Sequence, residues 1–284
     1  MNRIDKDNIF SLLFKTALKS GEVALSMQST IVNEKKPVDE IENETSCHKA
    51  MREAKTKADE IVQEMFLNAL LPYKDILTLD VEEDTCSTSL YNLKNYECTF
   101  ILDPIDGTLR YIQQEDGWSI CAGIIKENTF LCALVYFPKR KIMYVCEKYK
   151  GAYVYHNPKH IDDRKRLVFP SMINKDKIYY NYRLATSLVS YLQENGFEMI
   201  EDTKNQIGCP DAIIECINAK ACAYIGAGRN LRDILLAVIF SFMQQGKALD
   251  FQGNPIVWET HGRQKELVIT INAYLMQVLS KYKK

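Results

Sequence analysis

The run of residues with the clearest potential for chemistry is Asp103-Pro104-Ile105-Asp106-Gly107-Thr108. It follows the apolar segment 99–102, which predicts a strand, so both aspartates come at the carboxyl end of that strand. Asp-Pro and Asp-Gly are turn dipeptides, and a tight turn can direct two carboxylates to one point. Because no Lys or His stands in this run, we expect a hard divalent cation, Mg²⁺ first, to offset the two charges.

Gly107 and Thr108 are predicted to open a short helix after the strand. The first N–H groups of a helix have no partner inside it, so they can receive a phosphate group. The run therefore combines a predicted cation site with a predicted phosphate site.

The elements ahead of this run are predicted to be helical. Apolar residues recur at helical spacing from Asp7 to about Met27 and again from about Ala50 to Leu71. The segment 31–49 between them is polar, charged and interrupted by proline, which is typical of a surface loop.

The segments that follow change to β-prone composition, at 76–79, 99–102, 119–125, 129–137, 141–146 and 151–155. Short turn signals between them favour an antiparallel meander. Beyond a polar connection at 157–175, strands and helices alternate, and the helix predicted over 231–245 is apolar almost all round. This order predicts an α/β fold, a layered αβαβα sandwich whose first sheet is rich in antiparallel strands and whose second, mixed sheet lies in the C-terminal half. We expect an N-terminal half at 1–156 and a C-terminal half at 157–284.

The overall composition excludes several classes of protein. The 284 residues include 36 Lys and Arg against 37 Asp and Glu, a balance that argues against general nucleic-acid binding. Neither a membrane-length apolar run nor a secretory signal is evident, so we expect a soluble cytoplasmic protein. The nine cysteines form no Cys-x-x-Cys pair, which disfavours a zinc ribbon or a thioredoxin-type site.

The hexapeptide at 103–108 resembles the signature of the inositol monophosphatase superfamily of metal-dependent, lithium-sensitive phosphatases. Further features occur in the order found in that superfamily, and together they extend the resemblance over about residues 5–260. They are Thr56-Lys57-Ala58-Asp59, Val81-Glu82-Glu83, the segment 117–151, and Asn230-Leu231-Arg232-Asp233-Ile234 with the strand after it.

This resemblance implies specific roles for individual residues. Two or three Mg²⁺ ions would be held by oxygen atoms of Glu82, Asp103, Ile105 (its carbonyl), Asp106 and Asp233. The substrate would contact Asp106, Gly107, Thr108, Gly208 and Cys209, in part through backbone N–H groups. Thr108, oriented by Asp59, would position the attacking water together with Glu82. The implied activity is hydrolysis of a small phosphate monoester, inositol monophosphate or a related sugar phosphate, by a homodimer.

Departures from the pattern leave the substrate open. Arg232 stands where the family often has Trp, and Gly226 stands where inositol-specific members often carry an acidic residue. A 3′(2′),5′-bisphosphate nucleotidase and a fructose-1,6-bisphosphatase are therefore alternatives, and a non-catalytic RNA or transcription-complex partner on the same fold is a third.

Three segments keep two interpretations each. The loop 31–49 is either a solvated linker or a flap over a third metal. Gly208-Cys209-Pro210 is either a substrate contact or an ordinary helix start. Asp233 is either a metal ligand or an aspartate that complements a helix dipole.

Overall fold

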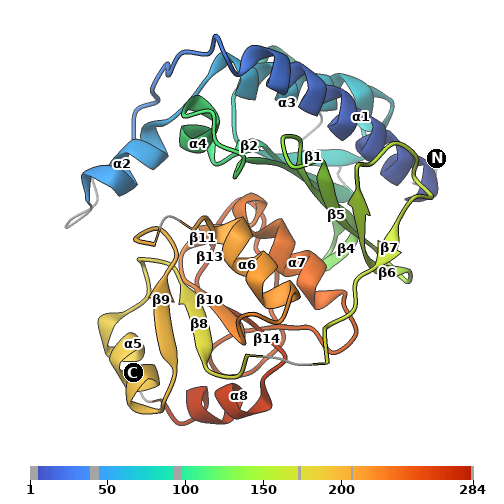
Figure 1. Ribbon diagram of the computed structural model, residues 1–284. Coiled ribbons are helices and arrows are strands. Elements are labelled where there is room, and N and C mark those ends of the chain that lie inside the picture. Colours follow the sequence, from blue (N-terminus) through green and yellow to red (C-terminus); the bar gives the residue numbers. More distant parts are fainter. Residues whose placement is uncertain (1–5, 39–44, 92–96, 172–173, 206, 283–284) are drawn as a thin grey trace. The chain divides into compact units, whose positions relative to one another are not determined.

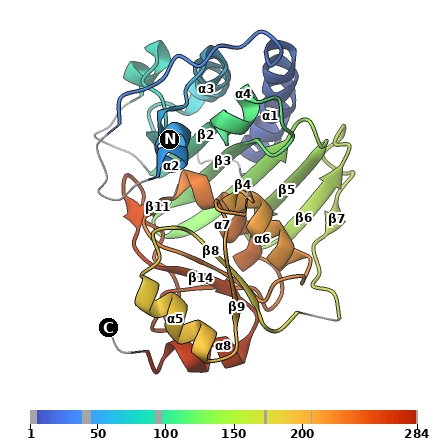
Figure 2. The ribbon, with the colours of Figure 1, turned by 60° about the vertical axis from the view of Figure 1, so that its left-hand side comes forward.

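The computed structural model describes residues 6–38, 45–91, 97–171, 174–205 and 207–282. The chain divides into two compact units, residues 1–148 with 154–165 and residues 149–153 with 166–284. Within the described residues, none of the helices combines the length and the apolar character needed to cross a bilayer. Figure 1 and Figure 2 show the elements of both units.

The first unit is built on a seven-stranded sheet of order β1-β2-β3-β4-β5-β6-β7. Its strands are β1 (Leu77–Val81), β2 (Cys98–Asp106), β3 (Ser119–Lys126), β4 (Thr129–Phe137), β5 (Ile142–Glu147), β6 (Gly151–His156) and β7 (Lys165–Arg166). The pairs from β2 to β5 are antiparallel, as the meander predicts, but β1 pairs with β2 in parallel. A connection of sixteen residues, 82–97, carries the chain back so that β2 can start beside the start of β1.

Helices pack on this sheet and on one another. They are α1 (Lys6–Met27), α2 (Ser46–Glu53), α3 (Lys57–Leu70) and α4 (Thr108–Ile112), with the 3₁₀ turns η1 (Leu71–Tyr73) and η2 (Cys86–Leu90). α1 and α3 lie side by side and contact strands β2 to β4 (Figure 1). The predicted apolar stripe of α1 is buried, with Phe10, Leu13 and Phe14 each at most 2% exposed.

The single helix predicted from Ala50 to Leu71 is instead two helices, α2 and α3, separated at 54–56. Thr56 starts α3 with a capping box, in which its side chain accepts from the helix and the Asp59 side chain accepts from the Thr56 backbone. The cap requires an extended backbone at Thr56, and this breaks the helix.

The second unit contains a five-stranded mixed sheet of order β12-β14-β10-β8-β9 and a small pair, β11 with β13. The strands are β8 (Lys177–Tyr180), β9 (Glu198–Glu201), β10 (Ala223–Gly226), β11 (Arg229–Asn230), β12 (Lys247–Leu249), β13 (Arg263–Gln264) and β14 (Leu267–Thr270). β8, β9 and β10 are mutually parallel, and β14 is antiparallel to both β10 and β12.

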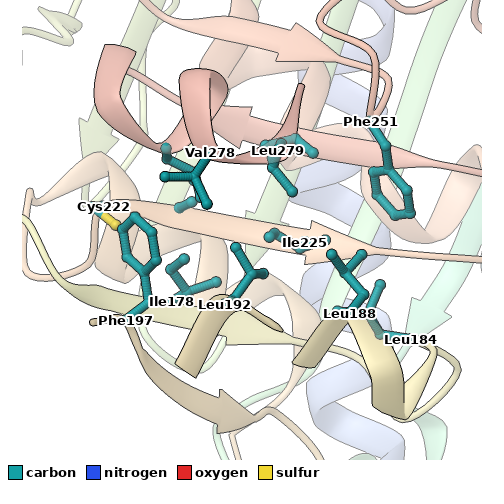
Figure 3. Packing of buried hydrophobic residues seen from close by; sticks show 13 residues of the cluster. Ile178, Leu184, Leu188, Leu192, Phe197, Cys222, Ile225, Phe251, Val278 and Leu279 are labelled. Atoms are coloured by element: carbon teal, nitrogen blue, oxygen red, sulfur yellow. The ribbon is translucent and has the colours of Figure 1, made fainter. Parts of the chain in front are cut away.

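Helices cover this sheet. They are α5 (Thr186–Glu194), α6 (Cys209–Ile217), α7 (Leu235–Ser241) and α8 (Ala273–Leu279), with the 3₁₀ turn η3 (Arg232–Ile234). α5 and α8 share a core with the strands, in which Ile178 and Ile225 lie among Leu188, Leu192 and Val278 (Figure 3). α6 and α7 contact each other, and they pack on β10, β12 and β14.

The helix predicted over 231–245 is shorter in the structure. It consists of η3 followed by α7, and residues Leu235–Phe240 are at most 2% exposed, as an all-apolar helix requires. Gln245 takes a left-handed backbone conformation, φ 74°, at the turn into β12, so the helix cannot continue through it. None of the nine cysteines, all of which lie in the described residues, forms a disulfide, and seven of them are buried.

Candidate active site

The register of β1 and β2 brings two of the predicted acidic residues together. Val81 lies opposite Leu102 in this parallel pair. The next residues, Glu82 after β1 and Asp103 in β2, are therefore neighbours across the pair. Asp103 is only 4% exposed. The proximity of these two carboxylates therefore follows from backbone hydrogen bonding between the strands.

A bulge in β2 turns Asp106 to the same side of the strand as Asp103. Asp103 lies opposite Cys121 and Asp106 opposite Ser119, so β2 takes three steps where β3 takes two. Residues three apart in a regular strand face opposite sides, and one inserted residue returns them to the same side. Pro104 has no N–H to give to the ladder, which suits it to the bulge.

Local hydrogen bonds fix the corner after the bulge. An oxygen of Asp103 accepts from the Ile105 N–H at 3.1 Å, and the Ile105 carbonyl accepts from the Thr108 hydroxyl at 3.0 Å. Gly107 has φ 84°, and a Cβ there would lie 3.3 Å from the Gly117 carbonyl oxygen. Glycine is therefore required at this position, and α4 starts directly after it, as predicted.

Thr108 is also linked to Asp59, which lies in the first turn of α3. The Thr108 hydroxyl is 3.3 Å from Asp59 Oδ1, while Asp59 Oδ2 accepts from the N–H of Thr56 at 2.9 Å and from its hydroxyl at 2.7 Å. Burial raises the pKa of Asp59 to about 7, against the opposing effect of the Thr56 hydrogen bonds, and the charges of Glu82 and Glu83 raise it further. Asp59 can therefore hold or release a proton near neutral pH.

Two lysines that the sequence argument did not include pair with the acidic residues after β1. Lys36 forms an ion pair with Glu82, and its ammonium lies 3.5 Å from Glu83 Oε1. Lys55 contacts Glu83 Oε2 and Glu60 Oε1, both at 2.9 Å. Lys36 and Lys55 therefore supply positive charge to Glu82 and Glu83.

The charge environment agrees with this pairing. Burial lowers the pKa of the Lys36 ammonium, but the attraction of Glu82 and its hydrogen bond outweigh that effect and raise it above its usual value. Hydrogen bonds to Glu60 and Glu83 likewise raise the pKa of Lys55. Both lysines are therefore fully charged at neutral pH.

Backbone pairing positions Lys36. The Glu34 N–H donates to the Lys55 carbonyl at 2.9 Å, and the Lys36 N–H donates to the Glu53 carbonyl at 2.8 Å. The first part of the predicted loop 31–49 is thus held against residues 53–55, and α2 begins at Ser46. Residues 39–44 lie outside the described residues.

A buried amide fixes the backbone on which Glu83 stands. The Glu83 N–H donates to Gln63 Oε1 at 3.0 Å, and the Gln63 amide donates to the Glu83 carbonyl. Gln63 has no exposed surface. Gln63 lies on α3 one turn after Asp59. The same helix therefore contacts both Glu83, through Gln63, and Thr108, through Asp59.

The donor set of this corner suits Mg²⁺ chemically. The predicted ligands of the first unit supply only carboxylate and carbonyl oxygens, which hard cations prefer. In the part of the chain that the structure describes, no group of three or more His, Cys, Asp or Glu side chains is arranged to hold a metal ion, and Glu82 is engaged by Lys36. The ligand roles of Glu82, Asp103, Ile105 and Asp106 therefore stay predictions.

The other predicted site residues belong to the second unit. Asp233 lies in η3, where its Oδ2 accepts from the Asn230 amide at 3.1 Å and its Oδ1 is 3.9 Å from Arg232 Nε. Gly208 is the N-cap of α6, and Cys209 is the first residue of that helix and is 7% exposed. α6 packs on η3 in this unit.

An ion pair with a buried carboxylate lies near these residues of the second unit. Arg229 donates to Asp202 Oδ2 at 3.0 Å, and the hydroxyl of Tyr224 is 3.3 Å from the same oxygen. Burial lowers the pKa of Arg229, but the attraction of Tyr224, Cys209 and Asp202 raises it overall. No sequence motif pointed to this pair.

The comparison with family models decides the family. The model of the inositol monophosphatase family matches residues 5–202, which is more than half of the chain. The chain belongs to the inositol monophosphatase family. The resemblance drawn from Asp103-Pro104-Ile105-Asp106-Gly107-Thr108 is thereby confirmed, and the chain is a member of a superfamily of phosphatases.

Solved structures of this family share the fold over nearly the whole chain. A staphylococcal IMPase-I complexed with products is 18% identical, with 100% of this chain and 99% of that chain covered and a TM-score of 0.71. An IMPase/NADP phosphatase complexed with Mg²⁺ and phosphate is 18% identical, with 98% and 97% covered and a TM-score of 0.70. These similarities confirm the predicted layered αβαβα sandwich.

A curated relative matches a shorter part. The 3′(2′),5′-bisphosphate nucleotidase CysQ of Aggregatibacter actinomycetemcomitans is 26% identical over 109 residues, which are 37% of this chain and 39% of that protein. The match thus spans less than two fifths of the length of this relative.

Proposed function

We propose that this protein hydrolyses a phosphate monoester of a small molecule in the presence of Mg²⁺. The observation that carries the proposal is the parallel register that sets Glu82 beside Asp103, with Asp106 brought to the same side by the bulge. The proposed ligands of two or three Mg²⁺ ions are Glu82, Asp103, Ile105 (its carbonyl), Asp106 and Asp233. When bound, Mg²⁺ supplies the positive charge that stabilises the phosphoryl oxygens and makes water a better nucleophile.

The residues behind the corner handle the proton. Thr108 has one hydroxyl hydrogen and two acceptors within reach, the Ile105 carbonyl at 3.0 Å and Asp59 Oδ1 at 3.3 Å. When Asp59 is ionised, the Thr108 hydroxyl donates to it and turns its lone pairs toward a substrate-side water. Asp59 then accepts the proton that this water releases through Thr108. The backbone N–H groups of Gly107 and Thr108 would hold the phosphate oxygens.

Two substrate classes are distinguished within this proposal. Inositol monophosphate or a related sugar phosphate is the first candidate, because the metal and phosphate corner requires nothing beyond a monoester. A 3′(2′),5′-bisphosphate nucleotide is the second, since Gly226 supplies no acidic contact for an inositol hydroxyl and the curated relative named above is a nucleotidase of that kind.

Phosphate release with and without Mg²⁺ tests the proposal. Inositol 1-phosphate, fructose 1,6-bisphosphate and 3′-phosphoadenosine 5′-phosphate are to be compared side by side, with Li⁺ as inhibitor. Asp103→Asn should lower Mg²⁺-dependent turnover by more than ~100-fold, beyond the ~10–100-fold expected for loss of a residue that only supports a ligand. Asp75→Asn, on an exposed loop, is the matched control. Unchanged activity of Asp103→Asn, or no release from any substrate, would favour a non-catalytic partner on this fold.

The homodimer implied by the family resemblance is also part of the proposal. Light scattering after size-exclusion chromatography measures the mass directly, and the proposal expects twice the 32.7 kDa of the chain.

A further inference from the structure

A cavity of about 770 Å³ lies between α1 and α3 in the first unit. Figure 1 shows these two helices side by side, and residues 84–86, just after Glu83, complete the wall. None of the residues assigned above to Mg²⁺ or to substrate lines it. Its volume is within the range of roughly 300–1,000 Å³ that is usual for pockets of small-molecule ligands.

One wall of this cavity is an apolar stripe of α3. Ile61, Met65 and Ala69 all line it, and they follow one another at intervals of four, so they lie on one face of the helix. These three side chains are only partly buried, whereas Val62 and Phe66 on the adjacent face are completely buried in the core. The helix therefore has a second apolar face that the described part of the chain leaves partly open.

The acidic residues around the cavity are already engaged. Glu60 is paired with Lys55 and Lys57. Glu64 accepts from the N–H of Ser87 at 2.9 Å and from its hydroxyl at 2.6 Å. Asp84 accepts from the hydroxyl of Thr88 at 3.0 Å. Each of these carboxylates is thus held by its own partners within the protein.

The basic residues contributed by α1 differ from these acids. Lys15 and Lys19 are one helical turn apart, both are exposed, and both line the cavity beside Thr16. No carboxylate of the described residues lies within ion-pairing distance of either lysine. On the α1 side, the cavity therefore presents two ammonium groups that no carboxylate of the described residues pairs, opposite the apolar stripe of α3.

We propose that this cavity binds a small amphipathic anion. The apolar body of the ligand packs on Ile61, Met65 and Ala69, and its carboxylate, sulfonate or phosphate group pairs with Lys15 and Lys19. The two lysine stems contribute further apolar contact, because a lysine covers its neighbours with methylene groups while its ammonium stays hydrated.

Fluorescence titration with 8-anilinonaphthalene-1-sulfonate tests this site, because the probe joins an aromatic body to one anionic group. The full-length protein should bind one probe molecule with saturation. N-phenyl-1-naphthylamine, which has the same rings without the sulfonate, should bind at least about tenfold more weakly, as expected when a favourable charge contact is lost.

Two kinds of variant separate charge from shape. Lys15→Glu with Lys19→Glu should weaken the anionic probe by about tenfold or more and leave the neutral probe within about twofold. Lys74→Glu with Lys159→Glu, at exposed lysines outside the cavity, is the matched control and should change neither. Ala69→Phe fills the cavity and should abolish binding of both probes, and near-UV circular dichroism shows whether this variant is folded.

Methyl NMR then locates the probe. The methyl signals of Met65 and Ile61 should shift on titration. The proposal is overturned if the two probes bind equally, if the double Glu variant binds the anionic probe like the wild type, or if the shifts fall only on other methyl groups. Because the Lys variants change exposed side chains, this outcome does not depend on the folding of Ala69→Phe.

Discussion

The acidic groups that lie near the predicted site residues are neutralised differently in the two units. In the first unit Glu82 and Glu83 are paired by Lys36 and Lys55, which come from segments outside the sheet. In the second unit Asp202 is paired by Arg229. A lysine ammonium is a point charge on a flexible stem, whereas a guanidinium is a planar fork that fixes its partner. The first arrangement is suited to exchange for another cation, and the second to permanent structure.

The largest effect should come from breaking the fixed pair of the second unit. Asp202 has no exposed surface, so Asp202→Ala leaves the Arg229 guanidinium without its buried counter-ion. We expect the free energy of unfolding, measured by urea titration, to fall by about 3–5 kcal/mol. Glu194→Gln, on the exposed side of α5, is the control and should have little effect. A loss below ~1 kcal/mol for Asp202→Ala would mean that the guanidinium is not fixed by this contact.

In the first unit, Asp59 should make stability depend on pH. Its folded pKa of about 7 is above the unfolded value of 3.8, so the folded state binds more protons between these values. Stability contributed by Asp59 is therefore present below about pH 4 and is lost as pH rises through 7, up to about 4 kcal/mol in total. Urea titrations of wild type and Asp59→Asn in Mg²⁺-free buffer measure it. Parallel pH profiles of the two proteins would contradict the raised pKa.

A smaller effect is expected from the cap that holds Asp59. Thr56→Val removes the hydroxyl that donates to Asp59 at 2.7 Å and accepts from the Ala58 N–H at 3.2 Å. We expect a loss of about 1–2 kcal/mol in unfolding free energy. Thr56→Ser keeps the hydroxyl and should retain most of the stability. A loss for Thr56→Val no larger than the loss for Thr56→Ser would contradict a cap that depends on the hydroxyl.

The smallest effect sharpens the comparison most directly. Lys36→Gln removes the ammonium that competes for Glu82, and this side chain is 26% exposed, so solvent weakens the pair to about 0.5–1 kcal/mol. Calorimetric Mg²⁺ binding should therefore tighten by about two- to fivefold. Lys35→Gln, at the much more exposed neighbouring lysine, is the control. Unchanged or weaker Mg²⁺ binding would show that Lys36 is not exchangeable.

The local features of the corner could be predicted from the sequence. An apolar run that ends in Asp103, and a Gly-Thr pair after Asp106, contain within a few residues the information for a strand, a turn and a short helix. The helix break at Thr56 had an equally local signal. Thr56 and Asp59 have the spacing of a capping box, but the apolar periodicity that predicts the helix from Ala50 to Leu71 continues through them.

The cations of the first unit could not be predicted in the same way. Lys36 and Glu82 are 46 positions apart, and their contact depends on pairing of residues 34–36 with 53–55. That pairing is made by backbone groups in a polar segment without apolar periodicity. The pattern of side chains therefore does not predict which residues pair there. The Arg229–Asp202 pair likewise depends on tertiary packing.

One carboxylate of α3 serves two purposes with its two oxygens. Asp59 Oδ2 closes the first turn of the helix on Thr56, and Oδ1 reaches Thr108 at the corner. If Thr108 acts in turnover as proposed, selection for heat resistance and selection for turnover act on the same carboxylate. Position 59 should then tolerate little change, even in variants evolved toward a new substrate.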